Sequence, residues 1–347
     1  MSTATKTAAA ARSAHLAREP RERLIAALPG AQFSAELIPH PYIPGQLRGI
    51  LRITADVEAA LAAADKLQGI RERNTGVVIP CRNDSAWLGS TCEQFIKDRY
   101  KPDAQGLAES DKIVDATDAA ARSIEFERPE TLASVVGSSP NVGAYLMGSP
   151  LSMYRTQQTV EQGLISKIHF GMAVSAGFSA KDMRNRAIAA FALARTIQTM
   201  RPVELYGVCA TEPSAPVTLV DNETGESDSV HTTIVISLSF GSAPFDATSA
   251  SRAACSPFLT RAVLYGIAYL CAGDNQCGWL GFPSIPFARC VEANKQLDVV
   301  IDGGHLSDAA EITKNPNKWV ERQLREWAAG RSTAYRVHTS GTIDNRW

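Results

Sequence analysis

The strongest constraint on the fold is a regular alternation of strand and helix patterns that begins near residue 160. Apolar, β-rich runs occupy four segments of this half (164–174, 203–210, 231–241 and 296–304). Helical spacing of apolar residues, or a long apolar run, marks three more (180–200, 253–272 and 315–330). Strands that alternate with helices of this length favour a largely parallel sheet with helices on both faces. The sequence therefore predicts an α/β fold.

The first half of the chain has a less regular pattern. A strand is predicted over 46–56 and a helix over 55–70, and residues 82–135 have a mostly helical, polar pattern. In 134–154, glycine, serine and proline interrupt short apolar pieces, which indicates a junction between two halves. These patterns divide the chain into an N-terminal arm (1–24), a smaller mixed α/β region (25–150), an α/β domain (151–341) and a C-terminal tail (342–347).

The charge of the chain argues against one class of function. The 35 Lys and Arg residues are balanced by 36 Asp and Glu residues, and the formal net charge is −1. Bulk electrostatic binding to nucleic acid needs a basic excess, so that class is disfavoured. The N-terminal arm is locally basic and keeps nucleic acid, or a neighbouring subunit, as an alternative partner. A net charge near zero gives little repulsion between copies, and we expect a homo-oligomer.

Neither a membrane span nor a secretory signal is predicted. The N-terminus lacks the apolar core of a signal peptide. The most apolar run, 253–272, is interrupted by Pro257 and Arg261 and is short for a membrane span. We therefore expect a buried helix there and no membrane partner. The seven cysteines form no CxxC pair, which is typical of reduced thiols in a cytosolic protein.

Oxygen-bearing side chains are predicted at the carboxyl ends of several strands. Ser175 and Ser179 follow the strand 164–174, Thr248 lies in a hydroxyl-rich loop, and Asp302 ends a later strand. Ligands of parallel α/β sheets bind at this edge, and hard oxygen ligands are what Mg²⁺ and Mn²⁺ require. These four residues are therefore candidate metal ligands.

Several strings in the sequence carry a resemblance to a known family. The segments WLGSTCEQFI, VVGSSPNVGAYLMGSPLSMY and SAGFSAKDMRNRAIAAFALARTI, the last followed by VELYGV, resemble an uncharacterised family encoded largely by bacteriophages. The likeness covers roughly residues 85–330. The C-terminal half is similar to a von Willebrand factor A-like domain. The resemblance implies a three-layer, Rossmann-like architecture with a mostly parallel sheet, and a phage protein located in the host cytoplasm or in the virion.

The chain departs from the metal-ion-dependent adhesion site of such domains, in which the pattern DxSxS follows the first strand. Ala173 stands in place of the leading Asp, and Ser179 lies four residues after Ser175 instead of two. Thr248 and Asp302 fit the later Thr and Asp. Because the first carboxylate is missing, we expect a degenerate site without a resident cofactor, and Mg²⁺ or Mn²⁺ binding is the alternative. In the other interpretation, the two serines cap a helix and Asp302 caps a turn.

Common catalytic motifs do not provide a function. The sequence has no GxGxxG after a strand, no GxxxxGK[ST], no HExxH and no GxSxG. His305, three residues after Asp302, is the histidine around which a hydrolase site is most easily imagined. His169 lies inside an apolar strand and is expected in the core. Arg184 and Arg186 either contribute to a basic stripe for phosphates or lie on a solvated helix face.

Three tryptophans are candidate protein-binding residues. Trp319 and Trp327 are eight residues apart and share one face of the helix 315–330. Such a pair packs in the core or, when exposed, marks a protein interface, because aromatic residues are enriched at interface hot spots. Trp347 ends a polar tail and is a candidate for docking into a neighbouring subunit.

Together these patterns predict a non-enzymatic, phage-encoded interaction or assembly protein. It would bind protein partners or copies of itself through the von Willebrand A-like domain. Two other classes remain as alternatives. One is a metal-assisted hydrolase at Asp302 and the loop 242–251, and the other is a nucleic-acid-associated factor that uses the N-terminal arm with Arg184 and Arg186.

Overall fold

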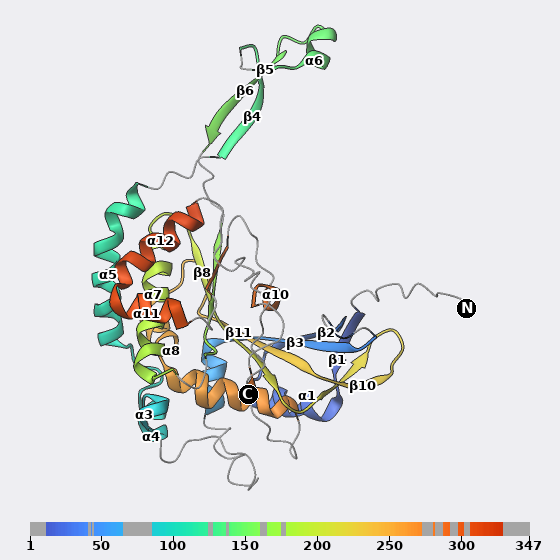
Figure 1. The fold of residues 1–347 in the computed structure, drawn as a ribbon, viewed down its shortest axis with the longest axis vertical. Helices are drawn as coiled ribbons and strands as arrows, with labels where there is room; N and C mark the ends of the chain where they lie inside the picture. The colour runs from blue at the N-terminus through green and yellow to red at the C-terminus, as the bar shows by residue number, and fades with distance from the viewer. Residues whose placement is uncertain are drawn as a thin grey trace.

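The computed structural model shows a body, built from a large sheet and its helices, and an arm that projects from one end of the body (Figure 1). It describes residues 12–40, 43, 45–64, 85–123, 128–136, 139–159, 165–174, 178–272, 280–281, 287–291, 298–301 and 306–328. Helices and strands are both abundant in these residues. The predicted α/β character is confirmed.

One sheet runs through the whole body. Among the described residues its strand order is β10-β9-β1-β2-β3-β11-β8-β7-β13, and β12 pairs with β8 off this path. The strands are β1 Arg12–Leu16, β2 Gln32–Pro39, β3 Leu47–Asp56, β7 Ser166–Gly171, β8 Val203–Pro213, β9 Val217–Asp221, β10 Ser227–Val230, β11 Thr232–Ser239, β12 Leu280–Gly281 and β13 Val299–Ile301. Strands from the predicted N-terminal arm, the N-terminal region and the C-terminal domain therefore share one sheet.

The sheet is mixed, which corrects the prediction of a mostly parallel one. β3 and β11, β7 and β8, and β7 and β13 pair in parallel, whereas the other pairs are antiparallel. The predicted hairpin at 222–225 is confirmed between β8 and β11 flank this hairpin and pair antiparallel, although both are apolar runs. A buried antiparallel strand has the same sequence pattern as a buried parallel one, so pattern alone did not reveal the direction.

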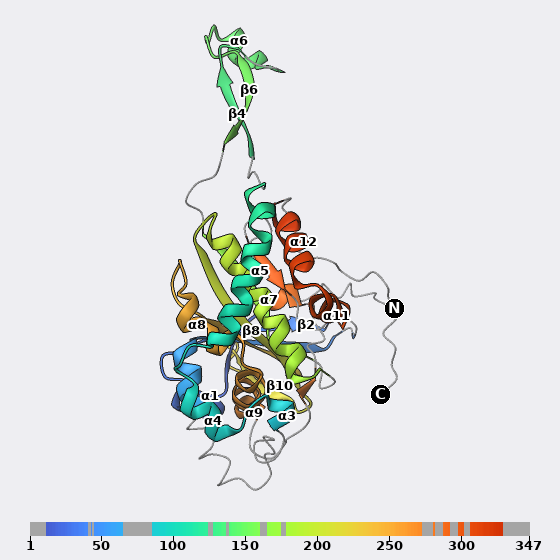
Figure 2. The ribbon, with the colours of Figure 1, turned by 90° about the vertical axis from the view of Figure 1, so that its left-hand side faces the viewer.

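Most described helices pack on one face of the sheet (Figures 1 and 2). They are α1 Arg18–Ala27, α3 Ser85–Leu88, α4 Cys92–Asp98, α5 Ala104–Arg122, α7 Ala180–Gln198, α8 Ala247–Ala254, the π-helix Leu259–Leu264, α9 Tyr265–Ala272, α11 Leu306–Lys314 and α12 Pro316–Ala328, and residues 57–64 are also helical. The short α10 (Phe287–Cys290) lies against the other face, where Phe287 and Cys290 pack with Val208 and Val300.

α7 is the central helix of the main core and confirms the predicted helix at 180–200. Ser179 caps it in a capping box: its Oγ accepts from the Asp182 N–H at 3.1 Å, and the Asp182 carboxylate accepts from the Ser179 N–H at 3.4 Å. All residues from Arg186 to Ala194 are buried, because α7 packs against β8 on one side and against α5 and α12 on the other.

The apolar run 253–272 is buried, as predicted, but it is not one straight helix. It contains the end of α8, the π-helix and α9, and the π-helix residues are all buried. No single helix in the described part of the chain is long and apolar enough to span a membrane. α8 and the segment Leu259–Cys271 together have the length and composition, but they are bent by 63°.

The projecting arm is inserted in the chain between α5 and β7, and we call it the hairpin arm. It consists of β4 (Arg128–Ser134), β5 (Ser139–Pro140), α6 (Val142–Leu146) and β6 (Met153–Thr159). β4 pairs antiparallel with one edge of β6, and β5 pairs with the other edge. The arm stands away from the body in both views (Figures 1 and 2). The segment 134–154, predicted as a junction, forms the far end of this arm, and the predicted boundary at 150/151 falls between α6 and β6.

Candidate functional site

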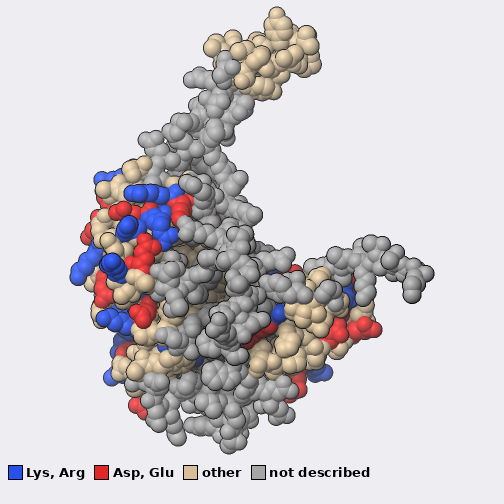
Figure 3. Space-filling model, viewed as in Figure 1, with Lys and Arg blue, Asp and Glu red and all other residues tan. Residues whose placement is uncertain are grey.

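The far end of the hairpin arm carries no charge. Between Glu130 and Arg155 the chain has no Lys, Arg, Asp or Glu. In Figure 3 the described surface at the end of the arm is entirely uncharged, whereas basic and acidic side chains are mixed over the described helices of the body. We call residues 133–154 the arm tip.

The backbone of the arm tip is held by its own hydrogen bonds. Asn141 caps α6, because its Oδ1 accepts from the Ala144 N–H at 3.1 Å. The Asn141 N–H donates to the Ser152 carbonyl at 2.8 Å and ties the start of α6 to the chain that enters β6. Gly148 follows α6 with a φ of +70°, a conformation that suits glycine after a helix. None of the described residues of the arm tip is buried, so they form no hydrophobic core.

Large apolar side chains are concentrated on the outside of the arm tip. Eight of them are exposed, from 37% for Tyr154 to 82% for Met147. They are Val135, Val136, Val142, Tyr145, Leu146, Met147, Leu151 and Tyr154. At about 100 Å² each they present on the order of 800 Å² of apolar surface, compared with roughly 300–600 Å² for the largest patch on a typical monomer. An exposed apolar surface of this size marks a site of interaction.

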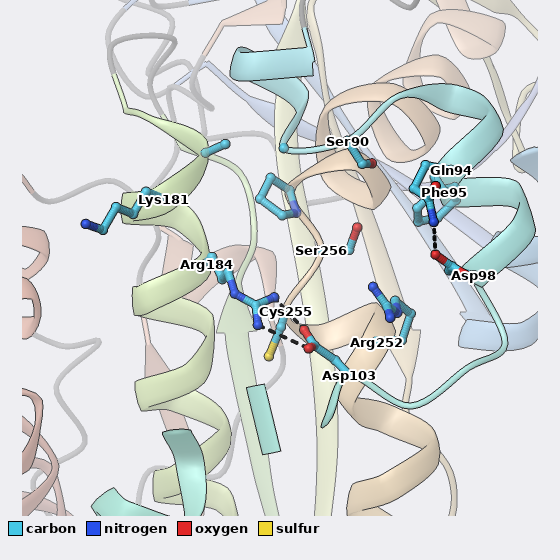
Figure 4. Close-up of a pocket in the computed structure, with 13 residues that line it drawn as sticks. Ser90, Gln94, Phe95, Asp98, Asp103, Lys181, Arg184, Arg252, Cys255 and Ser256 are labelled. Carbon is cyan, nitrogen blue, oxygen red and sulfur yellow. Dashed lines mark hydrogen bonds and ion pairs between the residues drawn. The ribbon is translucent and has the colours of Figure 1, made fainter. Parts of the chain in front are cut away.

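A second candidate site is a cavity of about 280 Å³ at the end of the body opposite the arm (Figure 4). Residues of α4, α7 and α8 line it, with residues from the turns before α4 and after α8. Its charged lining consists of Lys181, Arg184 and Arg252, which are basic, and Asp98 and Asp103, which are acidic.

Asp103 organises one wall of this cavity. It caps α5, and its carboxylate accepts from the Gly106 N–H at 3.0 Å and from both terminal nitrogens of Arg184, one of them at 3.1 Å. Burial raises the pKa of Asp103, but the hydrogen bonds from Arg184 and Gly106 outweigh it and the net shift is downward. The same carboxylate raises the pKa of Arg184. Both groups are therefore charged at neutral pH and hold each other in place.

Cys255 lies beside this ion pair but is not activated. Its side chain is buried, and burial raises the pKa of the thiol to about 12. A nucleophilic cysteine needs a lowered pKa, so this thiol is not a nucleophile at neutral pH. The described lining of the cavity offers charges and hydroxyl groups, which suit binding.

Comparison with known proteins places both candidate sites inside one family domain. The model of a family described as a domain of unknown function, DUF7192, matches residues 55–326. The chain belongs to the DUF7192 family. No curated protein and no solved structure matches the chain. The DUF7192 match includes the hairpin arm and every residue that lines the cavity, and it begins near the end of β3.

Two of the four predicted metal ligands lie in the described part of this DUF7192 chain, and both belong to helix starts. Ser179 is the N-cap of α7, as the capping interpretation predicted. Thr248 lies in the first turn of α8 and donates its N–H to Asp246 Oδ1 at 2.9 Å. Ser175 and Asp302 lie outside the described residues. Within those residues no group of three or more His, Cys, Asp or Glu side chains is placed to hold a metal ion.

The tryptophans predicted to bind partners do not present a surface in α12. Trp319 is 1% exposed and Trp327 is 4% exposed, and both belong to the main core. The Arg201 guanidinium lies over the Trp327 ring, 5.3 Å from its centroid. The pair therefore follows the core-packing alternative. Trp347 lies outside the described residues.

The predicted basic features are engaged within the fold. Arg186 is buried and donates to the Gly171 carbonyl at 2.9 Å, while Arg184 is paired with an aspartate, so these two do not form a solvent-facing stripe. In the predicted N-terminal arm, Arg12 belongs to β1 and pairs with Asp221 at 2.8 Å. The described basic residues named for nucleic-acid binding thus have partners in the protein.

His169 is buried in the core, as predicted, but it has no hydrogen-bond partner. Neither ring nitrogen is paired, and the ring stacks on Tyr206 at 5.3 Å between centroids. Burial lowers the pKa of His169 to about 4, so the imidazole is neutral at physiological pH. His305, the other histidine considered in the sequence, lies outside the described residues.

The arm tip was the functional surface that sequence reasoning missed. Its glycines, serines and prolines were interpreted as a junction, and its apolar residues were not separated from core residues. The signal that finds it is the absence of charge from Thr131 to Tyr154 together with turn residues that leave no room for a long buried element.

Proposed function

We propose that the chain is a non-enzymatic assembly protein that joins copies of itself through the arm tip. The observation that carries this proposal is the set of eight exposed apolar side chains at the end of an uncharged arm. Apolar surface left in water is unfavourable, and covering it drives association. Assembly supplies the cover that folding of one chain does not.

Size and charge favour a second copy as the partner. A standard protein–protein interface takes about 800 Å² from each side, which is the order of the area that one arm tip offers. Two tips packed face to face therefore form an interface of ordinary size. A two-fold contact brings identical surfaces together, and a surface without charge meets itself without repulsion. The net charge of −1 also lets whole chains approach each other.

The proposal includes the setting that the sequence resemblance implies. The matching strings support a phage-encoded protein in the host cytoplasm or the virion. A von Willebrand A-like arrangement of the body is supported by β7, α7 and β8, in which two parallel strands are joined by a helix, and by β13 parallel to β7. In this proposal the body is the platform and the arm makes the contact.

Sedimentation velocity of the full-length chain over a range of concentrations tests the proposal. We expect the wild type to form a dimer or a larger oligomer. The double variant Leu146→Glu, Met147→Glu is expected to be monomeric, because charges buried in an apolar contact lack partners. The matched control Ile25→Glu puts a charge on an exposed apolar position of α1 and keeps the wild-type oligomer.

Two results would overturn this proposal. One is a wild-type monomer at the highest soluble concentration, and the other is an oligomer that survives the double variant. A monomeric wild type that binds phospholipid vesicles through Leu146 and Met147 would assign the tip to a membrane surface, and that also counts against assembly. Because α6 has no buried residue, an unchanged circular dichroism spectrum of the double variant separates lost assembly from unfolding.

A further inference from the structure

The cavity between α4, α7 and α8 has one unmatched positive charge. Arg184 is matched by Asp103, and Asp98 is matched by Lys101, whose Nζ lies 2.7 Å from Oδ1. Within the described structure no carboxylate lies within ion-pair distance of Arg252. Its Nε and Nη2 donate instead to main-chain carbonyls of the turn between α4 and α5, at 3.2 and 3.5 Å. The charge of Arg252 is therefore available to an anion.

Two hydroxyl groups stand around the same space as Arg252 (Figure 4). Ser90 belongs to the turn before α4, and Ser256 follows α8. Ser256 Oγ accepts from the Leu259 N–H at 3.4 Å, which leaves its own hydrogen free to donate. Among the described residues neither hydroxyl has an acceptor. Three donor groups from three segments of the chain thus border one cavity.

We propose that this cavity binds the phosphate group of a small molecule. The oxygens of a phosphate point in tetrahedral directions, so one phosphate accepts from Arg252, Ser90 and Ser256 on different sides, whereas a carboxylate offers two oxygens in one plane. Bonds from a guanidinium to phosphate are also strengthened by charge. Lys181, which extends away from the other labelled side chains in Figure 4, adds positive charge at the rim.

The size of the cavity suits a small phosphorylated molecule. Its volume of about 280 Å³ exceeds what a phosphate alone occupies and is close to the lower end of the range of small-molecule sites. Ala180, Phe95 and Pro257 supply apolar lining beside the donors. Room for a short organic group therefore remains next to the phosphate.

The walls of the cavity are tied together before any ligand arrives. The Asp103 N–H donates to Ser251 Oγ at 2.9 Å, which joins the start of α5 to α8, the helix that carries Arg252. The carboxylate of Asp103 holds Arg184 of α7. Three helices thus have a fixed relation around the cavity, and a ligand does not need to order them.

Isothermal titration calorimetry of the full-length chain at constant ionic strength tests the proposal, with inorganic phosphate and phenyl phosphate as probes. We expect one saturable site for each probe. Arg252→Gln is expected to weaken binding by at least about tenfold, because a charged hydrogen bond is lost. The control Arg122→Gln removes the same charge from the exposed end of α5 and is expected to change affinity less than about twofold.

The double variant Ser90→Ala, Ser256→Ala keeps every charge of the cavity and so tests the site even if the Arg252 variant does not fold. Weaker phosphate binding by several-fold supports the proposal, and unchanged binding overturns it. Absence of saturable binding with both probes, or equal binding by wild type and Arg252→Gln, also overturns it. Acetate that binds as tightly as phosphate, with the same dependence on Arg252, would replace the phosphate assignment by a carboxylate one.

Discussion

The body and the hairpin arm use the same kinds of apolar side chain in opposite ways. In the body, Trp319 is 1% exposed, and the middle of α7 is buried on all sides. In the arm tip, Tyr145 and Met147 are 71% and 82% exposed, and the backbone is held by strand pairing and a capped short helix. The stability of the body therefore comes from packing, whereas the arm keeps its shape by local hydrogen bonds and reserves its apolar surface.

The largest expected contrast comes from truncating one side chain in each region. Trp319→Ala should lower the free energy of unfolding by about 3–5 kcal/mol, because it leaves a cavity in the core. Leu146→Ala in the arm tip should change it by less than about 0.5 kcal/mol, measured below the concentration at which chains associate. Urea unfolding followed by tryptophan-independent circular dichroism compares the two. Similar losses in both variants would contradict the division between body and arm.

Acid should expose the same contrast, because the body holds a buried histidine and the arm tip holds no ionisable acid or base at these pH values. Burial lowers the pKa of His169 to about 4 from 6.5, so the unfolded chain takes up a proton that the folded chain refuses. Stability from this group is complete above pH 6.5 and falls by about 3 kcal/mol as the pH drops to 4.

The variant His169→Leu checks this pH dependence. It cannot take up the proton in either state, so its unfolding free energy should vary less with pH between 6.5 and 4 than that of the wild type. Lys167, which lowers the pKa of His169, and Glu204, which raises it, stay in place in this variant. Parallel pH profiles for the two proteins would show that His169 does not carry the effect.

A smaller effect is expected where the body is held by one ion pair. Asp103→Asn should cost about 2 kcal/mol at pH 7, because it weakens the α5 cap and leaves Arg184 without its partner. The folded pKa of Asp103 is lowered, so this difference from wild type should be present above pH 3.8 and vanish as the pH falls through the folded pKa. The control Asp111→Asn, at a more exposed pair with Arg195, should cost less than about 1 kcal/mol.

The smallest change in stability, and a large change in assembly, is expected from Val135→Ser with Val136→Ser. Both side chains are exposed, at 65% and 75%, so the unfolding free energy of the monomer should stay within about 0.5 kcal/mol of wild type. Sedimentation should show weaker association, since the contact loses apolar area. Lost stability without a change in association would place these valines in the fold of the arm instead.

Local patterns predicted individual elements better than their arrangement. α7, β3, β8 and the β9–β10 hairpin agree with the sequence because helical spacing, apolar runs and turn glycines act within a few residues. The direction of β11 beside β8 depends on contacts between distant segments, and its apolar pattern is the same in either direction. The fold class was therefore predictable, and the mixed sheet was not.

The candidate sites were harder to predict for a related reason. Ser90, Arg252 and Ser256 border one cavity, but the first is far from the other two in sequence, and none belongs to a recognised motif. Thr248, proposed as a ligand on its spacing, instead takes part in a helix start. Exposure cannot be read from apolar content, and this is why Trp319 was considered for an interface while Met147 was not.

The length of the hairpin arm turns it into a spacer. β4 and β6 have seven residues each, which corresponds to a rod of about 23 Å. Two arms joined at their tips therefore hold two bodies on the order of 50 Å apart, like the weights of a dumbbell. The bodies do not need matching surfaces, and the cavity, at the end of the body away from the arm, faces outward on both copies. Joining the copies thus leaves each cavity open to its own ligand.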